Sequence, residues 1–429
     1  MYFYNTQSNV FRLFRKMSGG YFLNSLINNA IPFLLLPILT KYLAPGDYAN
    51  ITLFTAYVAI FNAIIGAGLN SLIAKYFFIS ELKIVACLIG NIIIILAIFS
   101  ISTVLLMSIN YKYIANTTAL PLTWFLLIPI NSFTYLVFQL VLGVIRNEKK
   151  VFSFSLHQIG NSFLNFFISL MFIVLLAYNW QGRVLGIILS NIISASLAIN
   201  YLYKNNYIYM SFNISIAKEV LRFVVALIPN SLQLVLVPRI GIFFIQFYFS
   251  KTLLGIYSIG YQIAYVVMII IITLKLSWEP FFFEELNKNE EPKNILVVRM
   301  FYLHLFVIIV SVVFVNIFDN LIIKFMTNPE YYSAHDVVFW LTVGMFFNGF
   351  NLLIQPFFIH RNEEVFLGKM SFLNLIMMVI INYFSIKYWK YEGVPIAYFL
   401  THFTLSLGFI CKISMSSNLP WLSAFLVKK

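Results

Sequence analysis

One arginine stands inside a long apolar run and is the side chain in this sequence best suited to bind a charged ligand. Arg239 lies between Arg222 and Lys251, and no other charged residue separates those two positions. An arginine near the middle of a membrane helix costs about 2.5–3.5 kcal/mol on insertion scales, so such residues usually mark functional sites. Because a guanidinium donates paired hydrogen bonds to phosphates and carboxylates, Arg239 is a candidate anion site.

Carboxamide side chains recur at helical spacing in several apolar runs and are the second set of candidate binding groups. A single buried amide commonly bonds a neighbouring membrane helix, at about 0.6 kcal/mol. Amide stripes on several helices, together with a membrane-depth arginine, favour a polar cavity, with scattered interhelical bonding as the alternative. The candidate substrate-binding residues are Arg239, Asn230, Gln233, Asn28, Asn161, Asn165 and Asn351.

Prolines interrupt two of the apolar runs at corresponding places. Pro32 and Pro37 lie in the first run, and Pro229 and Pro238 lie in the run that contains Arg239. A proline inside a helix leaves a carbonyl without its usual partner, and paired interrupted helices point to the binding site of a transporter. We therefore select these four prolines as candidate helix-break or gating residues, with ordinary kinks as the alternative.

The acidic residues and cysteines of the sequence show no arrangement typical of a catalytic or metal-binding site. The 15 acidic residues fall in expected loops or at expected helix ends, so Arg239 has no expected carboxylate partner within the membrane. Cys87 and Cys411 lie in separate runs without metal-ligand spacing. We expect no catalytic residues, no metal and no cofactor.

Composition indicates an all-α polytopic membrane protein. The 429 residues are 61% hydrophobic and 10% charged, against about 25% charged residues in a soluble protein. The net charge of +13 does not indicate nucleic-acid binding, because the basic residues cluster in short segments between apolar runs. This clustering predicts that both termini lie in the cytoplasm.

The apolar runs predict about 12 transmembrane helices in two six-helix bundles around a central cavity, with domains at 1–205 and 206–429. In the sixth span, small residues every fourth position predict a close packing seam, formed by Gly182, Gly186, Ser190, Ser194 and Ala198. The expected spans are 20–43, 49–74, 84–110, 122–145, 152–178, 184–203, 223–250, 254–276, 296–318, 335–359, 365–389 and 393–413.

Two stretches resemble a known family. Residues 21–77, with the turn "KYLAPGDY" and Lys75 after the second span, and residues 220–265 are similar to Wzx-type O-antigen flippases. These belong to the multidrug/oligosaccharidyl-lipid/polysaccharide (MOP) exporter superfamily, which also holds the MATE transporters. Lys41 and Lys75 stand at helix ends, whereas related lipid II flippases carry basic residues within the first two helices. This departure disfavours a peptidoglycan-precursor role.

The resemblance implies alternating access in the bacterial inner membrane. The implied cargo is an undecaprenyl-pyrophosphate-linked oligosaccharide, moved from the cytoplasmic to the periplasmic leaflet. Implied partners are the lipid bilayer, polysaccharide polymerase or assembly proteins, and a coupling ion, either proton or sodium. The alternatives are a MATE-like antiporter of small molecules or cations and, third, an O-antigen polymerase or membrane glycosyltransferase.

Overall fold

The protein is helical throughout the part of the chain that the structure describes. The computed structural model describes residue 28, residues 31–113, 118, 120–286, 291–416 and 421, and within these ranges there is no strand. Ten helical segments there are long and apolar enough to cross a membrane, and the last of them, Val365–Ser414, contains two helices. A shorter apolar helix, Ile31–Tyr42, precedes them. The prediction of an all-α polytopic membrane protein is confirmed.

The chain folds into two compact units, which we call unit 1 and unit 2. Unit 1 comprises the described parts of Met1–Leu43 and Asp47–Val235, and unit 2 those of Ala44–Gly46 and Leu236–Lys429. The sequence predicts a boundary at residue 205, but in the structure the boundary falls about one helix later. The linker 205–213 and most of the following helix therefore pack with unit 1.

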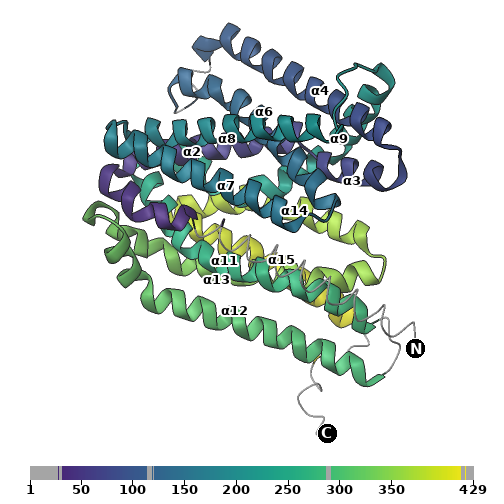
Figure 1. Cartoon of the computed structure of the whole chain (residues 1–429). Helices are drawn as coiled ribbons and strands as arrows, with labels where there is room; N and C mark the ends of the chain where they lie inside the picture. Colours follow the sequence, from purple (N-terminus) through teal and green to yellow (C-terminus); the bar gives the residue numbers. More distant parts are fainter. Residues whose placement is uncertain are drawn as a thin grey trace. The chain divides into compact units, whose positions relative to one another are not determined.

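Unit 1 is a bundle in which α8 contacts both α6 and α7, and α6 also contacts α4 (Figure 1). Its core is aliphatic and includes Ile89 of α4 and Val137 and Val141 of α6, all fully buried. Its labelled helices are α2 (Pro45–Ile65), α3 (Leu69–Ile79), α4 (Leu82–Ile109), α6 (Leu122–Asn147), α7 (Val151–Leu170) with the π-helical η1 (Met171–Leu175), α8 (Asn179–Lys204) and α9 (Ile214–Leu236).

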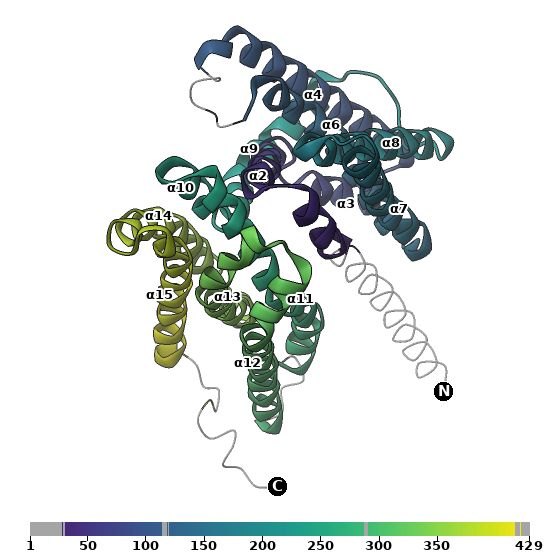
Figure 2. The same ribbon diagram turned by 90° about the vertical axis from the view of Figure 1, so that its left-hand side faces the viewer.

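Unit 2 is a second bundle, in which α13 contacts α11, α12 and α15, and α15 contacts α14 (Figure 2). Trp278 of α11 is fully buried, and its indole Nε1 donates a 2.7 Å hydrogen bond to the carbonyl of Leu353. Its helices are α10 (Ile240–Tyr248), α11 (Lys251–Leu286), α12 (Glu291–Met326), the 3-10 helix η2 (Pro329–Ala334), α13 (His335–His360), α14 (Glu364–Trp389), η3 (Lys390–Glu392) and α15 (Gly393–Ser416).

The predicted packing seam on α8 is confirmed. A Cβ on Gly186 would lie 2.1 Å from Ser169 Oγ and 2.9 Å from Ser169 Cα, and a Cβ on Gly182 would lie 3.0 Å from Phe172 Cβ. The absence of side chains at these two positions lets α8 approach the end of α7 closely. This approach sets the spacing of the two helices that carry half of the polar lining residues described below.

The predicted span 223–250 is not one continuous helix. Helix α9 already begins at Ile214, and it ends at Leu236; α10 begins at Ile240. Pro238 lacks an amide hydrogen and its ring clashes with the preceding turn, so the helix breaks there. The amide of Arg239 donates a 2.8 Å hydrogen bond to the carbonyl of Leu236, which closes the turn between the two helices.

The linker 205–213 is held against unit 1 by side-chain hydrogen bonds. Asn91 of α4 is fully buried; its Nδ2 donates to the Ser211 carbonyl at 3.0 Å, and its Oδ1 accepts from the Asn213 amide at 2.9 Å. The Tyr207 hydroxyl donates to Glu148 Oε1 at 3.1 Å. Burial, and then the nearby Glu148 carboxylate, raise the pKa of Tyr207 to about 12, so its hydroxyl stays protonated and able to donate.

Candidate functional site

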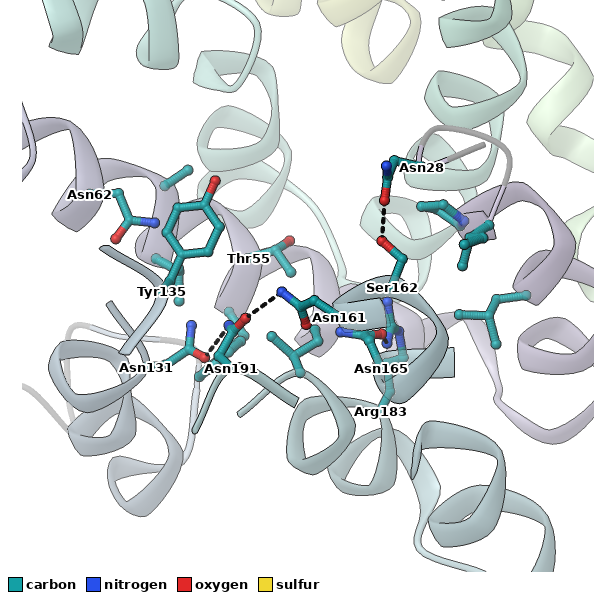
Figure 3. A pocket seen from close by; sticks show the side chains of 17 residues that line it. Asn28, Thr55, Asn62, Asn131, Tyr135, Asn161, Ser162, Asn165, Arg183 and Asn191 are labelled. Atoms are coloured by element: carbon teal, nitrogen blue, oxygen red, sulfur yellow. Dashed lines mark hydrogen bonds between the residues drawn. The ribbon is translucent and has the colours of Figure 1, made fainter. Parts of the chain in front are cut away.

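A polar cavity of about 300 Å³ lies within unit 1 (Figure 3). Five elements contribute to its wall: the first helix, α2, α6, α7 and α8. Apolar side chains such as Phe54 and Ile187 complete the wall. The polar lining residues are Asn28, Thr55, Asn62, Asn131, Tyr135, Asn161, Ser162, Asn165, Arg183 and Asn191.

Hydrogen bonds between three of the asparagines form a chain across α7, α8 and α6. Asn161 Nδ2 donates to Asn191 Oδ1 at 3.4 Å, and Asn191 Nδ2 donates to Asn131 Oδ1 at 2.9 Å. Elsewhere in the cavity lining, Ser162 Oγ of α7 donates to Asn28 Oδ1. These bonds fix the orientation of the amides before any ligand is present.

Arg183 brings a positive charge to this cavity, and sequence reasoning missed it. The predicted span began at residue 184, which left Arg183 in an outer loop, but α8 begins at Asn179 and places Arg183 one turn inside the helix. Its Nη1 donates to Asn165 Oδ1 and, at 2.8 Å, to Ser169 Oγ. The signal in the sequence was the i, i+4, i+8 spacing of residues 183, 187 and 191, all of which line the cavity.

The electrostatic character of the cavity is positive. Among the lining residues that the structure describes, Arg183 is the only charged one, and none carries a carboxylate. The guanidinium also lies close enough to the Tyr48 hydroxyl for the two groups to interact electrostatically. A polar, partly desolvated site with a cation and many amides favours a ligand that is anionic and rich in oxygen atoms.

Several predicted site residues come together at this cavity. Asn161 and Asn165 line it from α7, Pro32 lines it from the first helix, and Asn28 also lies in the lining. The stripe that the sequence indicated on α7 therefore faces a cavity, although Gln158, which continues that stripe, is not among the lining residues. A substrate-binding role for the three asparagines stays a prediction, as does a helix-break or gating role for Pro32.

Asn351 is not among the described residues that line this cavity, and it lies buried in unit 2. It is 2% exposed, its Nδ2 donates to the His402 carbonyl at 3.1 Å, and its Oδ1 accepts from Ser406 Oγ at 2.8 Å. These bonds join α13 to α15. Such bonds are typical of a single buried amide between membrane helices. A substrate-binding role for Asn351 stays a prediction.

The three binding residues that the sequence predicts in this run, Arg239, Asn230 and Gln233, lie at the helix break or on α9 before it. Arg239 is half-buried at the start of α10, and its guanidinium interacts electrostatically with the hydroxyls of Tyr261 and Tyr265 of α11. Asn230 is exposed and Gln233 half-buried on α9, which belongs to unit 1 up to Val235. The anion-binding role of Arg239 stays a prediction.

The candidate gating prolines differ in what they do to their helices. The first helix continues through Pro37, and α9 continues through an exposed Pro229. Pro238 coincides with a helix break, and Pro32 lines the cavity.

One acidic residue also lies elsewhere than the sequence predicted. Asp319 was expected in an outer loop after residue 318, but α12 extends to Met326 and encloses it. It is 3% exposed, and its Oδ2 lies 2.9 Å from His335 Nδ1 at the start of α13. The described part of the chain therefore holds one buried carboxylate within an apolar helix, paired to a histidine.

Comparison with known proteins identifies the fold. No protein-family model matches the chain. It is 25% identical over 426 residues to a protein of the Lsg locus of Haemophilus influenzae, covering 90% of this chain and 97% of that protein. It is also 23% identical over 291 residues to an uncharacterized membrane protein of the same organism, covering 64% of this chain and 66% of that protein.

Solved structures of transporters share this architecture. An inward-facing multidrug resistance MATE family transporter of the MOP superfamily matches with a TM-score of 0.71 at 14% identity, over 91% of this chain and 98% of that one. A MOP superfamily transporter from Pyrococcus furiosus matches with a TM-score of 0.63 at 15% identity, over 93% and 96%. A Vibrio cholerae MATE transporter matches with a TM-score of 0.59 at 13% identity, over 97% and 99%. The protein thus has the fold of the MATE and MOP transporters.

Proposed function

We propose that this protein is a flippase for a lipid-linked oligosaccharide. It moves an undecaprenyl-pyrophosphate-linked repeat unit, of O-antigen or a related polysaccharide, from the cytoplasmic to the periplasmic leaflet of the bacterial inner membrane by alternating access. Both termini face the cytoplasm, the lipid tail stays in the bilayer, and a proton or sodium ion supplies the coupling. Polysaccharide polymerase or assembly proteins act on the product.

The observation that carries this proposal is the chemistry of the cavity wall in unit 1. Six asparagines and Arg183 line it, and the described lining contains no carboxylate. Amides match the hydroxyl and ring oxygens of sugars, and a guanidinium matches an anionic group on the same glycan. The MOP fold supports the transport step, since the fold is that of known transporters.

Arg239 is the proposed contact for the pyrophosphate. It is half-buried at a helix break, where Pro238 loosens the backbone, and two tyrosine hydroxyls of α11 lie within electrostatic range. A guanidinium at such a position donates paired hydrogen bonds to phosphate oxygens, which an ammonium group cannot do.

A MATE-like antiporter of small molecules or cations is the second candidate. The fold suits both functions, and the Asp319–His335 pair is the observation in favour of the antiporter, because a buried carboxylate can carry a proton or a cation. Asp319→Asn discriminates between them: an antiporter loses ion-dependent transport of its small substrate, and a flippase retains polysaccharide export. A membrane glycosyltransferase or polymerase ranks third, since the described residues between α12 and α13 form only the short η2.

The test of the flippase proposal is deletion of the gene followed by complementation. Deletion should abolish surface polysaccharide while lipid-linked repeat units accumulate on the inner leaflet. Complementation with Arg239→Ala should restore a normally abundant protein but little export, and Arg239→Lys should restore part of it. Arg222→Ala, an exposed arginine near the start of α9, is the matched control. Normal polymer in the deletion strain would refute the proposal.

A further inference from the structure

The hydrogen bonds of the cavity wall leave it unusually rich in donors. Four of its asparagines already accept a hydrogen bond through their carbonyl oxygen from another wall residue: Asn28 from Ser162, Asn131 from Asn191, Asn165 from Arg183 and Asn191 from Asn161. The amide nitrogens of Asn131, Asn165 and Asn191 each carry two hydrogens, and the bonds above use at most one of them. The hydrogen bonds within the wall therefore occupy amide oxygens and leave N–H groups of these three asparagines for a ligand.

Two buried polar atoms at this cavity have no partner among the described residues. They are the Nδ2 of Asn131, a donor, and the Oδ1 of Asn62, an acceptor. A buried amide group without a partner costs about 1–3 kcal/mol, so a ligand that satisfies both atoms gains affinity. Figure 3 shows Asn62 and Arg183 toward opposite ends of the lining residues. A ligand with a hydroxyl at one end and an oxyanion at the other fits this arrangement.

Arg183 supplies the charge that selects the oxyanion. Its Nη1 is engaged by Asn165 and Ser169, while Nη2 and Nε have no partner among the residues that the structure describes. Those two nitrogens are the side of the guanidinium fork that pairs with two coplanar oxygens of a carboxylate. The contacts of Nη1 fix the plane of the fork, so little side-chain freedom is lost when a ligand binds.

We infer that the cavity is a specificity pocket for a sugar that carries a carboxylate, such as a uronic acid. The inference rests on the proposed flippase function and deepens it by naming a chemical feature of the cargo. The carboxylate pairs with Arg183, ring and hydroxyl oxygens accept from the asparagine N–H groups, and one hydroxyl donates to Asn62 Oδ1.

Charge and size favour a sugar carboxylate over the pyrophosphate at this position. A pyrophosphate diester carries two negative charges, and the described wall offers one cation, so one buried charge would stay uncompensated at considerable cost. A carboxylate carries one negative charge, which the single cation of the wall compensates. The volume of about 300 Å³ is at the lower end of the ~300–1,000 Å³ typical of ligand sites, which suits part of a repeat unit.

The test compares two synthetic cargos that differ in one sugar. Purified full-length protein in proteoliposomes is given undecaprenyl-pyrophosphate-linked disaccharides that end in glucuronate or in glucose. Exposure of the glycan is scored with periodate, which cleaves the vicinal diols of both sugars from outside the membrane. Because both cargos share the same pyrophosphate and lipid, any preference reports on the carboxylate. The wild-type protein should show a KM about 10- to 100-fold lower for the glucuronate cargo.

Arg183→Gln should remove this preference, so that the KM values for the two cargos become equal, while Arg183→Lys should retain part of it. Arg146→Gln, at an exposed position near the end of α6, is the matched loss of one positive charge and should behave as wild type. Equal KM values for the two cargos in the wild-type protein would overturn the inference and leave the flippase proposal standing. An equal loss for both cargos in Arg183→Gln would also overturn it, because Arg183 would then serve the shared pyrophosphate. No transport of either cargo by an intact wild-type protein would refute the flippase proposal itself.

Discussion

Replacing Asn91 by alanine tests whether the linker 205–213 is fixed to unit 1. The side chain bonds the Ser211 carbonyl at 3.0 Å and the Asn213 amide at 2.9 Å, so the substitution removes both bonds at once. Ser211 is half-buried and Asn213 is exposed, which means that water can replace part of the lost bonding. The net value of about 0.5–1.5 kcal/mol per hydrogen bond therefore applies, and the linker should lose about 1–3 kcal/mol of local stability.

Hydrogen exchange of the linker amides measures this loss directly. Since 1.4 kcal/mol corresponds to a factor of ten, exchange at Tyr209 and Asn213 should accelerate about 10- to 100-fold in Asn91→Ala. Exchange in the core of α6 should not change. Asn110→Ala is the matched control on the same helix, because the Asn110 side chain bonds only the carbonyl of Leu106, four residues earlier. Linker exchange within twofold of wild type in Asn91→Ala would show that this residue does not hold the segment.

Three further predictions follow from packing, burial and charge distribution. Gly186→Val should lower the thermal unfolding temperature in detergent, because the valine side chain would collide with Ser169 and overpacking costs about 1–3 kcal/mol. Gly160→Ala should leave that temperature unchanged, because there is open space around Gly160. Asp319→Ala should destabilise unit 2 by about 1–3 kcal/mol in urea-dependent unfolding, because it leaves the hydrogen-bonding partners of a buried carboxylate without their acceptor. An equal effect from Asp336→Ala, which replaces an exposed carboxylate, would contradict this. The distribution of basic residues predicts that reporter fusions after Lys150, Lys204 and Glu291 report the cytoplasm and that fusions after Asn116 and Glu330 report the periplasm. An inverted signal at either periplasmic site would refute the topology.

Apolar run length predicted the helices well because bilayer thickness constrains it directly. Helix ends were less predictable, since the chain gains backbone hydrogen bonds by extending a helix through polar residues. Asn179 to Arg183 illustrate this: the sequence "NWQGR" looks like a loop, yet it forms the first turn of α8 and brings Arg183 into the cavity. The same effect encloses Asp319 within α12.

The roles of the amides could be predicted only in part. Asn161 and Asn351 have the same local pattern, an amide on a polar stripe of an apolar helix. Asn161 lines a cavity and Asn351 bonds α15, and the difference depends on which helix lies opposite. Helical periodicity gives the face of a residue but not the partner of that face. Likewise, Pro229 and Pro238 are alike in sequence, and only Pro238 coincides with a break.

The position of the unit boundary has a consequence for how the chain is made. Unit 1 is complete only with most of α9: Leu227 and Phe223 lie where any side chain on Gly68 would have to go, and Glu219 accepts from the Tyr76 hydroxyl. During synthesis, unit 1 therefore cannot close until about residue 235 has entered the membrane. A fragment that ends at residue 205 should be a poor folding unit and a target for proteolysis, and coexpressed halves should assemble best when the cut lies beyond α9.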